Sequence, residues 1–291
     1  MEKLRKWSGS LHKSFRLLPT AQFGNDDLLA FLNSEDGVHW RDIYDRLPYD
    51  ASRSGGAGRG NHEEDEGQEE DGGEGVPDPK RYRDPKQVFE ACGLLWQDDG
   101  GRVWFTEFGR TVKRFIVHAN EKNVSLLAQH AAFGLSACQL RNPTGAGKKY
   151  HEEMCVFPFR FIWEAMLKLD YRINSEELNR AVFLTRNRDM LDEAIEMIRH
   201  YRRTGKIEDL GEEAITGRSK NDRIIPLVAL ASFGWTLLAQ KDEAGFYTVK
   251  PECIRLLEAA VSLPAKHRDF PTVKSYVEAI SSTACIPRDY R

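Results

Sequence analysis

The sequence predicts a mainly α protein with short β-hairpins, of the α+β class, in which two winged-helix-like lobes are joined by a helical connector. The strongest pattern lies between residues 155 and 204, where apolar residues recur at helical spacing in three consecutive segments. Two hairpin patterns, at residues 95–105 and 238–250, each combine an acidic, glycine-containing turn with an aromatic strand and a following helix. Helices followed by a hairpin, found twice, predict the two lobes.

The length of 291 residues leaves room for two domains, and the composition is that of a globular protein. We expect five parts along the chain. They are a basic arm at residues 1–24, a first lobe at 25–118 with a disordered acidic insertion at 52–79, a helical connector and linker at 119–150, a second lobe at 151–262, and a C-terminal tail at 263–291.

The first lobe begins with two short predicted helices, at residues 25–37 and 40–47, and a third helix follows the insertion. Residues 95–97 and 103–105 then form two strands around an Asp-Asp-Gly-Gly turn. Thr106 is expected to cap the next helix. Three helices, a hairpin and a helix are the order of a winged helix, whose third helix enters a DNA groove while the hairpin contacts phosphate.

The insertion contains most of the negative charge. Residues 63–74 include eight carboxylates, and without them the formal net charge changes from −3 to +5. The insertion has almost nothing apolar to bury, so it is predicted to be disordered. The rest of the chain is mildly basic, which permits a polyanionic partner without requiring one.

The connector is predicted to be an apolar helix at residues 124–140. The loop after it contains Gly-Ala-Gly-Lys-Lys, which invites comparison with a phosphate-binding loop. It lacks the leading glycine and the Ser or Thr after the lysine that such a loop needs. We therefore interpret it as a flexible basic linker.

The second lobe begins with a helix at Pro158, which suits the first turn of a helix. A break at Asp170–Asn174 follows, and Asn174 with Glu177 predicts a capping box for the second helix. The third helix is predicted to end at Gly205.

The second hairpin is expected later in the chain. Residues 224–238 are predicted to be a buried helix running into a strand, residues 241–245 a turn, and residues 246–250 the returning strand. In the tail we expect a helix at residues 273–280.

Catalytic and metal-binding patterns are absent from the sequence. The five cysteines have no Cys-x-x-Cys spacing, and the eight histidines form no metal-binding group. No strand pair supplies the acidic-x-Lys set of a Mg²⁺-dependent nuclease. We therefore expect no catalytic residues, no bound metal and no cofactor.

We also expect a cytoplasmic protein without a membrane partner. No apolar run approaches the roughly 18 residues needed to span a bilayer. The basic N-terminal stretch lacks the apolar core of a signal peptide. The odd, widely spaced cysteines suit a reducing compartment.

Basic residues near aromatic ones are the most informative pattern for function. They recur at equivalent positions of the two lobes, where arginine can contact phosphate or guanine. A solvated face is the competing interpretation of any single cluster. The candidate DNA-binding residues are Arg81, Arg83, Lys86, Arg102, Arg110, Lys113, Arg114, Arg186, Arg188, Arg199, Arg202 and Arg203.

One long run also resembles a known family. The sequence VFPFRFIWEAMLKLDYRINSEELNRAVFLTRNRDMLDEAIEMIRHYR has a Pro-Phe-Arg helix start, an Ile-x-x-Glu-Glu-Leu second helix and a third helix ending in Tyr-Arg. With the preceding FEACGLLWQDDGGRVWFTEFGR, it resembles the DNA-recognition region of AlwI-like type II restriction endonucleases over residues of about 80–260. Those enzymes carry a separate Mg²⁺-dependent nuclease domain, which we do not see in this sequence. The resemblance implies DNA recognition in a restriction or phage-defence setting and does not by itself imply cleavage.

The sequence therefore predicts a double-stranded DNA-binding recognition protein of a restriction or phage-defence system, without a recognisable nuclease site. Double-stranded DNA is the expected partner, and a nuclease or other effector subunit is a candidate second partner. Two alternatives stay open. One is a type II restriction endonuclease with an unrecognised Mg²⁺-dependent site, and the other is a winged-helix transcription regulator or protein-interaction adaptor.

Overall fold

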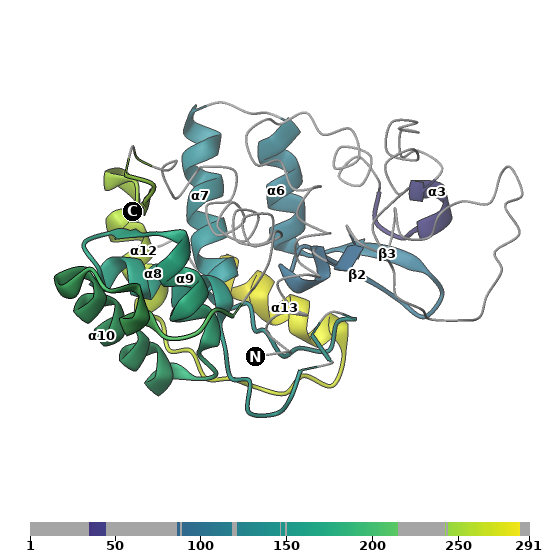
Figure 1. The fold of residues 1–291 in the computed structure, drawn as a ribbon. Helices are drawn as coiled ribbons and strands as arrows, with labels where there is room; N and C mark the ends of the chain where they lie inside the picture. The colour runs from purple at the N-terminus through teal and green to yellow at the C-terminus, as the bar shows by residue number, and fades with distance from the viewer. Residues whose placement is uncertain are drawn as a thin grey trace, which may run out of the picture.

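The computed structural model describes residues 35–44, 86–117, 121–214 and 242–285, except residues 88, 146, 149 and 243. Within them, α-helices and two small antiparallel sheets give the mixed α+β fold that the sequence predicts (Figure 1). The elements in chain order are β1 (Val38–His39), α3 (Trp40–Tyr44), β2 (Leu95–Gln97), β3 (Arg102–Phe105), α6 (Glu107–Val117), α7 (Glu121–Ser136), α8 (Pro158–Lys168), β4 (Arg172–Ile173), α9 (Ser175–Arg180), α10 (Arg188–Thr204), β5 (Tyr247–Thr248), α12 (Ile254–Ser262) and α13 (Val273–Ala284). Single 3₁₀ turns follow α9, α10 and β5.

Several predicted features lie outside the described residues. They are the basic arm, most of the helix predicted at 25–37, the acidic insertion at 52–79, residues Arg81 and Arg83, and the apolar stretch at 224–238.

The first sheet confirms the predicted hairpin and adds a strand to it. β2 and β3 are antiparallel, with Leu95 opposite Phe105, and Asp98–Gly101 form the turn. Gly101 has a φ of 77°, a left-handed conformation that glycine adopts without strain. β1 pairs with the other edge of β3, which gives the strand order β1-β3-β2. A strand of two residues is too short to show alternation, so the sequence did not reveal it.

The second sheet contains a strand that the sequence did not predict, whereas the strand predicted to pair with residues 246–250 lies outside the described residues. β5 pairs with β4, with Arg172 opposite Thr248, and β4 lies inside the predicted break at Asp170–Asn174. Asp170 and Tyr171 have φ values of 57° and 60°, and the Arg172 amide donates to the Leu169 carbonyl at 3.3 Å. This tight turn reverses the chain between α8 and β4, so the break in helical pattern is a turn followed by a strand.

The helix starts predicted at Pro158 and Asn174 and the helix end predicted at Gly205 are confirmed, whereas the second helix ends at Arg180, before the 3₁₀ turn at Val182–Leu184. Pro158 is the first residue of α8, where its missing amide hydrogen costs no hydrogen bond. Asn174 and Glu177 form the reciprocal capping box of α9. α10 ends at Gly205, whose φ of 70° stops the helix in the left-handed conformation.

Helix α13 confirms the predicted helix in the tail and extends it to Ala284. It packs against α6, α7 and β2, and Tyr276 and Val277 are fully buried. The Tyr276 hydroxyl donates to the Ala91 carbonyl at 3.0 Å and accepts from the Gln139 amide at 3.1 Å. The tail segment is therefore part of the core.

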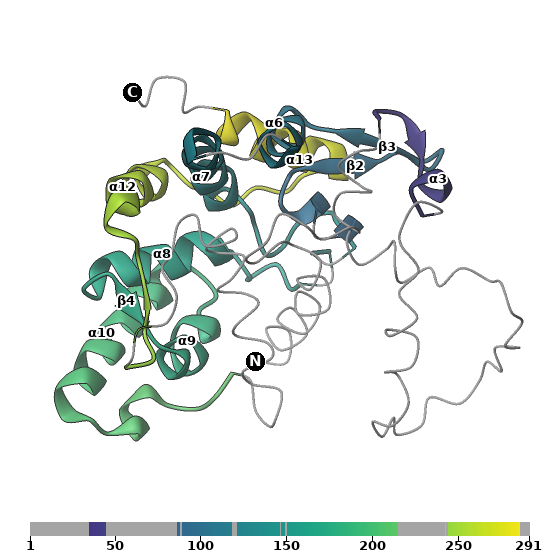
Figure 2. The same ribbon diagram turned by 90° about the horizontal axis from the view of Figure 1, so that it is seen from above.

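Helices α6, α7 and α13 lie between two groups of elements (Figure 1). We call β1, α3, the helical residues 86, 87 and 89–91, β2 and β3 the N-terminal unit, and α8, β4, α9, α10 and β5 the C-terminal unit. Seen from above, α12 lies beside α7 and α8, both of which it contacts (Figure 2).

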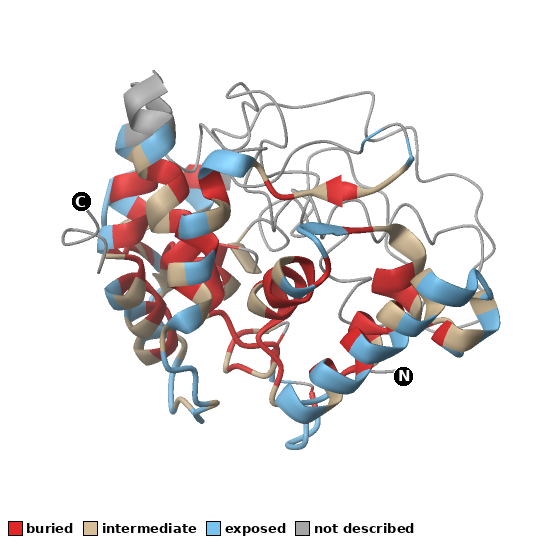
Figure 3. Ribbon diagram, turned by 90° about the vertical axis from the view of Figure 1, so that its left-hand side faces the viewer, coloured by how far each residue is buried: buried red, intermediate tan, exposed pale blue. Residues whose placement is uncertain are grey.

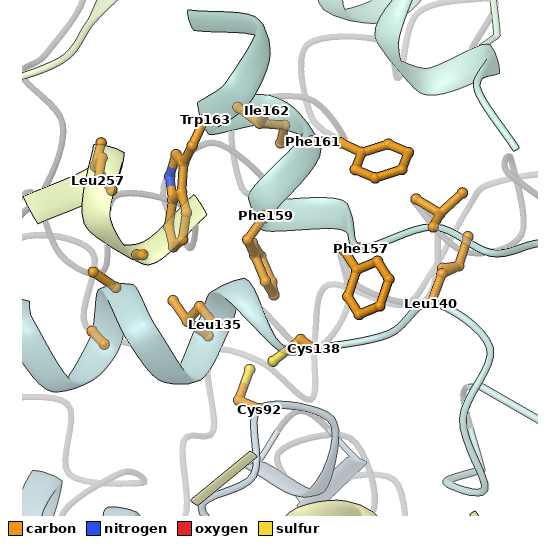
Figure 4. Close-up of a cluster of buried hydrophobic side chains, with 14 of the residues drawn as sticks. Cys92, Leu135, Cys138, Leu140, Phe157, Phe159, Phe161, Ile162, Trp163 and Leu257 are labelled. Atoms are coloured by element: carbon orange, nitrogen blue, oxygen red, sulfur yellow. The ribbon is translucent and has the colours of Figure 1, made fainter. Parts of the chain in front are cut away.

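Large apolar side chains of α7, α8 and α12 pack together in one core. The Trp163 side chain of α8 is fully buried and lies between Leu257 of α12 and Leu135 of α7 (Figure 4). The thiols of Cys92 and Cys138 point toward each other beneath this cluster (Figure 4). Buried residues follow the inner faces of the helices, and exposed residues follow the outer faces (Figure 3).

The loop predicted as a flexible basic linker is instead folded onto the core. Thr144 is fully buried, and its amide and hydroxyl both donate to Asn142 Oδ1, at 2.9 and 2.6 Å. The Asn142 side-chain amide donates to the Gln139 carbonyl at 2.8 Å. A polar sequence of this kind is typical of an exposed linker. Here, however, the polar side chains form hydrogen bonds with backbone groups of a buried turn.

Candidate nucleic-acid interface

Helix α10 carries most of the predicted contacts of the C-terminal unit. Asn187 caps its start, where Oδ1 accepts from the Met190 amide at 3.0 Å. Its buried face consists of Leu191, Ala194, Ile195 and Ile198. The remaining positions point away from this face, and they include the predicted arginines.

The exposed side of α10 is basic at both ends and acidic between them. Arg186 and Arg188 lie at the start and Arg203 at the end, and a helix of 17 residues is roughly 25 Å long. The exposed carboxylates between these ends are Asp189, Asp192, Glu193 and Glu196. The predicted basic margin is therefore two separate basic ends and not one surface.

Arg202 is held inside the fold. Its Nε and Nη2 donate to the two carboxylate oxygens of buried Glu177 at 2.7 and 2.9 Å. Nη1 donates to the Leu169 carbonyl at the end of α8, and Nη2 also donates to the Arg172 carbonyl, both at 2.8 Å. The guanidinium also lies over the Phe246 ring, 5.4 Å from its centroid. These contacts join α8, β4, α9 and α10.

Arg188 and Arg199, two other predicted arginines around α10, have fewer contacts within the protein than Arg202 has. Arg188 pairs with Glu164 of α8 and with Asp192, the latter at 3.7 Å. Arg199 pairs with Glu196 and donates to the Lys168 carbonyl at 2.9 Å. All of these pairs leave the arginine partly exposed to solvent.

Arg186 and Arg203 are the most accessible predicted residues of the C-terminal unit. Arg186 is half exposed and lies 3.6 Å from a carboxylate oxygen of Glu153. Arg203 is exposed, and within the described part of the chain its side chain has no hydrogen bond or ion pair. Both guanidinium groups can reach a ligand without breaking a buried contact.

In the N-terminal unit and α6, the predicted residues do not form one cluster. Lys86 lies 3.6 Å from buried Glu90, and burial raises the pKa of this carboxyl group while Lys86 lowers it. Arg110 pairs with Asp36 at 2.7 Å. Arg114 is exposed, and among the described residues its side chain has no ion pair.

Two further predicted residues contact the first sheet. Exposed Arg102 donates to the Gly37 carbonyl at 3.0 Å. The Lys113 ammonium group lies 5.8 Å from the centroid of the Phe105 ring. Both contacts place a positively charged side chain near the β2–β3 hairpin.

The turn of the β2–β3 hairpin and the turn before β5 both contain acidic residues. Asp98 accepts from the Trp104 indole at 2.9 Å and from the Arg102 amide at 2.8 Å, and these two hydrogen bonds lower its pKa. Asp242 accepts from the Phe246 amide at 2.8 Å in the second turn. These carboxylates shape the turns and would repel phosphate, so the hairpin tips are unfavourable places for a DNA backbone.

Two exposed cations that the sequence did not single out lie near aromatic rings. Arg41 of α3 lies over the Trp40 ring, 5.5 Å from its centroid. Arg172 of β4 lies over Phe246 at 4.9 Å. The basic-aromatic pattern that identified the other candidates also covers Arg41, which follows Trp40 directly. The Arg172–Phe246 contact depends on the pairing of β4 with β5.

Nothing in the described residues indicates metal chemistry. No group of three His, Cys, Asp or Glu side chains in this part of the chain is placed to hold a metal ion. Across the same residues, none of the helices is long and apolar enough to cross a membrane. A search of protein-family models and a search of curated proteins both find no match to this chain.

Proposed function

We propose that the chain is a double-stranded DNA-binding protein built from two winged-helix lobes, which acts as a recognition component of a restriction or phage-defence system. The observation that carries this proposal is a repeated arrangement. In both units a short strand precedes two helices, and a later strand returns to pair antiparallel with the first one. The defence setting rests on the resemblance of residues of about 80–260 to the AlwI-like recognition region.

The N-terminal unit supports the proposal through its strand order. β1 is followed by α3, the helical residues 86, 87 and 89–91, and the β2–β3 hairpin, and the sheet order is β1-β3-β2. This strand order supports the proposal because, in a winged helix, the strand between the first two helices pairs with the last strand of the hairpin, and most of the helix predicted before β1 lies outside the described residues.

The C-terminal unit supports it through the same sequence of elements. α8, β4, α9 and α10 follow in order, and β5 returns to pair with β4. In this arrangement α10 takes the place of the third helix, which inserts into the major groove in proteins of this kind.

The charges of α10 suggest how it would contact DNA. Arg186 and Arg203, at its two ends, are placed for phosphate groups, which position a protein on the duplex without reading its sequence. The exposed carboxylates in the middle, such as Glu193, would accept hydrogen bonds from base amino groups, since Glu and Asp pair with cytosine N4 in the major groove.

A mobility-shift assay with a duplex of about 40 base pairs at low salt, on the order of 50 mM, tests the proposal. Wild-type protein should retard the duplex, and Arg203→Glu and Arg114→Glu should each weaken binding. Lys148→Glu, the same type of charge reversal at an exposed lysine, should bind like the wild type. Failure to bind any duplex at low salt would exclude the proposal.

A protein-interaction adaptor is the second candidate. The exposed face of α10 favours it, because Met197, whose side chain is 38 % exposed, lies on the same surface as Asp192, Glu193 and Glu196. A stable partner that co-purifies with both the wild type and Arg203→Glu, but not with Met197→Asp, would support this alternative.

A further inference from the structure

The turn between α8 and β4 holds two residues in an unfavourable backbone conformation. Asp170 and Tyr171 have φ values of 57° and 60°, which lie in the left-handed region that glycine adopts most easily. The Arg172 amide donates to the Leu169 carbonyl at 3.3 Å and closes the turn. Two consecutive residues with positive φ are typical of a type I′ turn, whose preferred sequence is Asn-Gly. Glycine would therefore suit the position of Tyr171 better than tyrosine does.

The surrounding structure fixes this turn. Arg202 Nη1 and Nη2 donate to the carbonyls of Leu169 and Arg172, on the two sides of the turn, both at 2.8 Å. The Val249 amide donates to the Tyr171 carbonyl at 2.9 Å. A strained conformation persists only where the surrounding structure determines it in this way, and such positions are frequent at functional sites. The orientation of the turn is thus set by α10 and by the segment after β5.

The Tyr171 side chain makes no contact within the described residues that would explain its presence. It is 41 % exposed, and only Met197 is a comparably exposed large hydrophobic residue in this part of the chain. Among the described residues, its hydroxyl group makes no hydrogen bond and its ring makes no aromatic or cation contact. Packing therefore does not explain why tyrosine occupies a position that favours glycine. We interpret the exposed phenol group as a contact for a partner.

Cationic groups lie close to Tyr171 in the fold. Arg172 follows it directly and is exposed, and its guanidinium lies 4.9 Å from the centroid of the Phe246 ring. Arg202 contacts the turn, so the end of α10 with the exposed Arg203 lies next to it. Guanidinium groups beside a hydroxyl donor form a favourable surface for phosphate.

The acidic groups near this turn are offset or distant. Asp170 is exposed, but its carboxylate lies 3.9 Å from Arg202 Nη1, which offsets part of its charge. Asp242 belongs to the turn before β5, whereas Tyr171 lies beside Val249, which follows β5. Asp242 and Tyr171 therefore lie at opposite ends of the small sheet.

We propose that Tyr171 is a DNA-contacting residue, whose hydroxyl donates a hydrogen bond to a backbone phosphate of the duplex while Arg172 and Arg203 provide positive charge. The contact would position the C-terminal unit on the duplex without reading its sequence. This inference rests on the proposed function, because it names a further contact of the same DNA-binding unit. It adds a residue that a search for basic side chains in the sequence does not single out.

Fluorescence anisotropy with a labelled duplex of about 40 base pairs at low salt, on the order of 50 mM, tests the contact together with urea denaturation of the same variants. Tyr171→Gly should weaken duplex binding at least about tenfold, since hydrogen bonds to charged groups are among the stronger ones. The same change should leave the denaturation midpoint unchanged or raise it, because glycine adopts the left-handed conformation without strain. Loss of both affinity and stability would show that Tyr171 serves the fold and would overturn the inference.

Asp170→Gly is the matched control, because it relieves the same strain in the same turn and keeps the phenol group. It should bind the duplex at least as tightly as the wild type. Tyr171→Phe should weaken binding, because it removes only the hydroxyl donor. Equal loss of affinity in Asp170→Gly and Tyr171→Gly, or wild-type affinity of Tyr171→Phe, would contradict the proposed contact.

Failure of the contact and failure of the proposed function give different results. If the wild type binds the duplex and Tyr171→Gly binds it equally well, the inference fails and the DNA-binding proposal stands. If the wild type binds no duplex at low salt, both fail.

Discussion

At the scale of single residues, Arg202 shows how a basic side chain near a helix end can serve the fold. Sequence pattern alone made it a candidate for phosphate contact, like its neighbour Arg203. Its partner Glu177 lies 25 positions earlier in the chain, and only the packing of α9 against α10 brings the two together. The sequence therefore identified the basic end of α10, but it could not show that Arg202 makes internal contacts while Arg203 is exposed.

Arg202→Ala should destabilise the protein strongly. Glu177 is fully buried, and removal of its partner leaves an uncompensated carboxylate, which typically costs about 3–5 kcal/mol. Urea denaturation measures the change in the free energy of unfolding. Arg203→Ala is the matched control, and its effect should stay within about 0.5 kcal/mol because the side chain is exposed. Equal effects of the two changes would show that Arg202 does not hold the fold.

His267 should make stability depend on pH. Burial, and after it the charge of Arg141, lowers the pKa of His267 below its ordinary value, whereas Asp269 opposes the shift. Between the unfolded value of about 6.5 and the lower folded value, the unfolded state binds a proton that the native state does not. The free energy of unfolding should therefore fall as the pH decreases through this window.

Denaturation curves at a series of pH values measure this dependence. His267→Gln should flatten the fall in the free energy of unfolding below a pH of about 6.5, because the variant lacks the titrating group. A variant with the same pH dependence as the wild type would show that His267 does not contribute.

At the scale of elements, local signals predicted helices better than strands. Pro158, the Asn174–Glu177 capping box and Gly205 set helix ends through contacts within a few residues, which a sequence pattern can reveal. β1 and β4 each have two residues and pair with strands far along the chain. Their existence depends on tertiary packing, which no local pattern records.

The position of α13 in the fold likewise could not be predicted from the sequence. Its periodicity predicted a helix, but its place against α6 and α7 depends on long-range contacts. Tyr276 provides one of them, since its hydroxyl joins the Ala91 carbonyl to the Gln139 amide.

Tyr276→Phe tests this contact. The change leaves the buried Gln139 amide and Ala91 carbonyl without their partner, which should lower the free energy of unfolding by about 1–3 kcal/mol. Thermal and urea denaturation measure the loss. Tyr171→Phe is the control, because the Tyr171 side chain is 41 % exposed and its replacement should have little effect. A Tyr276→Phe variant as stable as the wild type would contradict the role of this hydroxyl.

At the scale of the whole molecule, two units lie on either side of a central helical group, and each contains a short strand, two following helices and a later strand that pairs with the first (Figure 1). The sequence predicted two lobes and a connector from repeated patterns. The sequence did not predict that exposed carboxylates lie between the two basic ends of α10, because a helix places residues that are close in sequence on different sides of its axis.

Salt dependence of duplex binding tests the central claim most directly. Fluorescence anisotropy with a labelled duplex should give a logarithm of the binding constant that falls linearly with the logarithm of salt concentration, with a slope of about −0.9 for each phosphate neutralised. The variant with both Arg114→Glu and Arg203→Glu should have a shallower slope, by about one for each phosphate that the variant no longer neutralises. Binding that is absent at low salt, or that does not change with salt, would contradict the account.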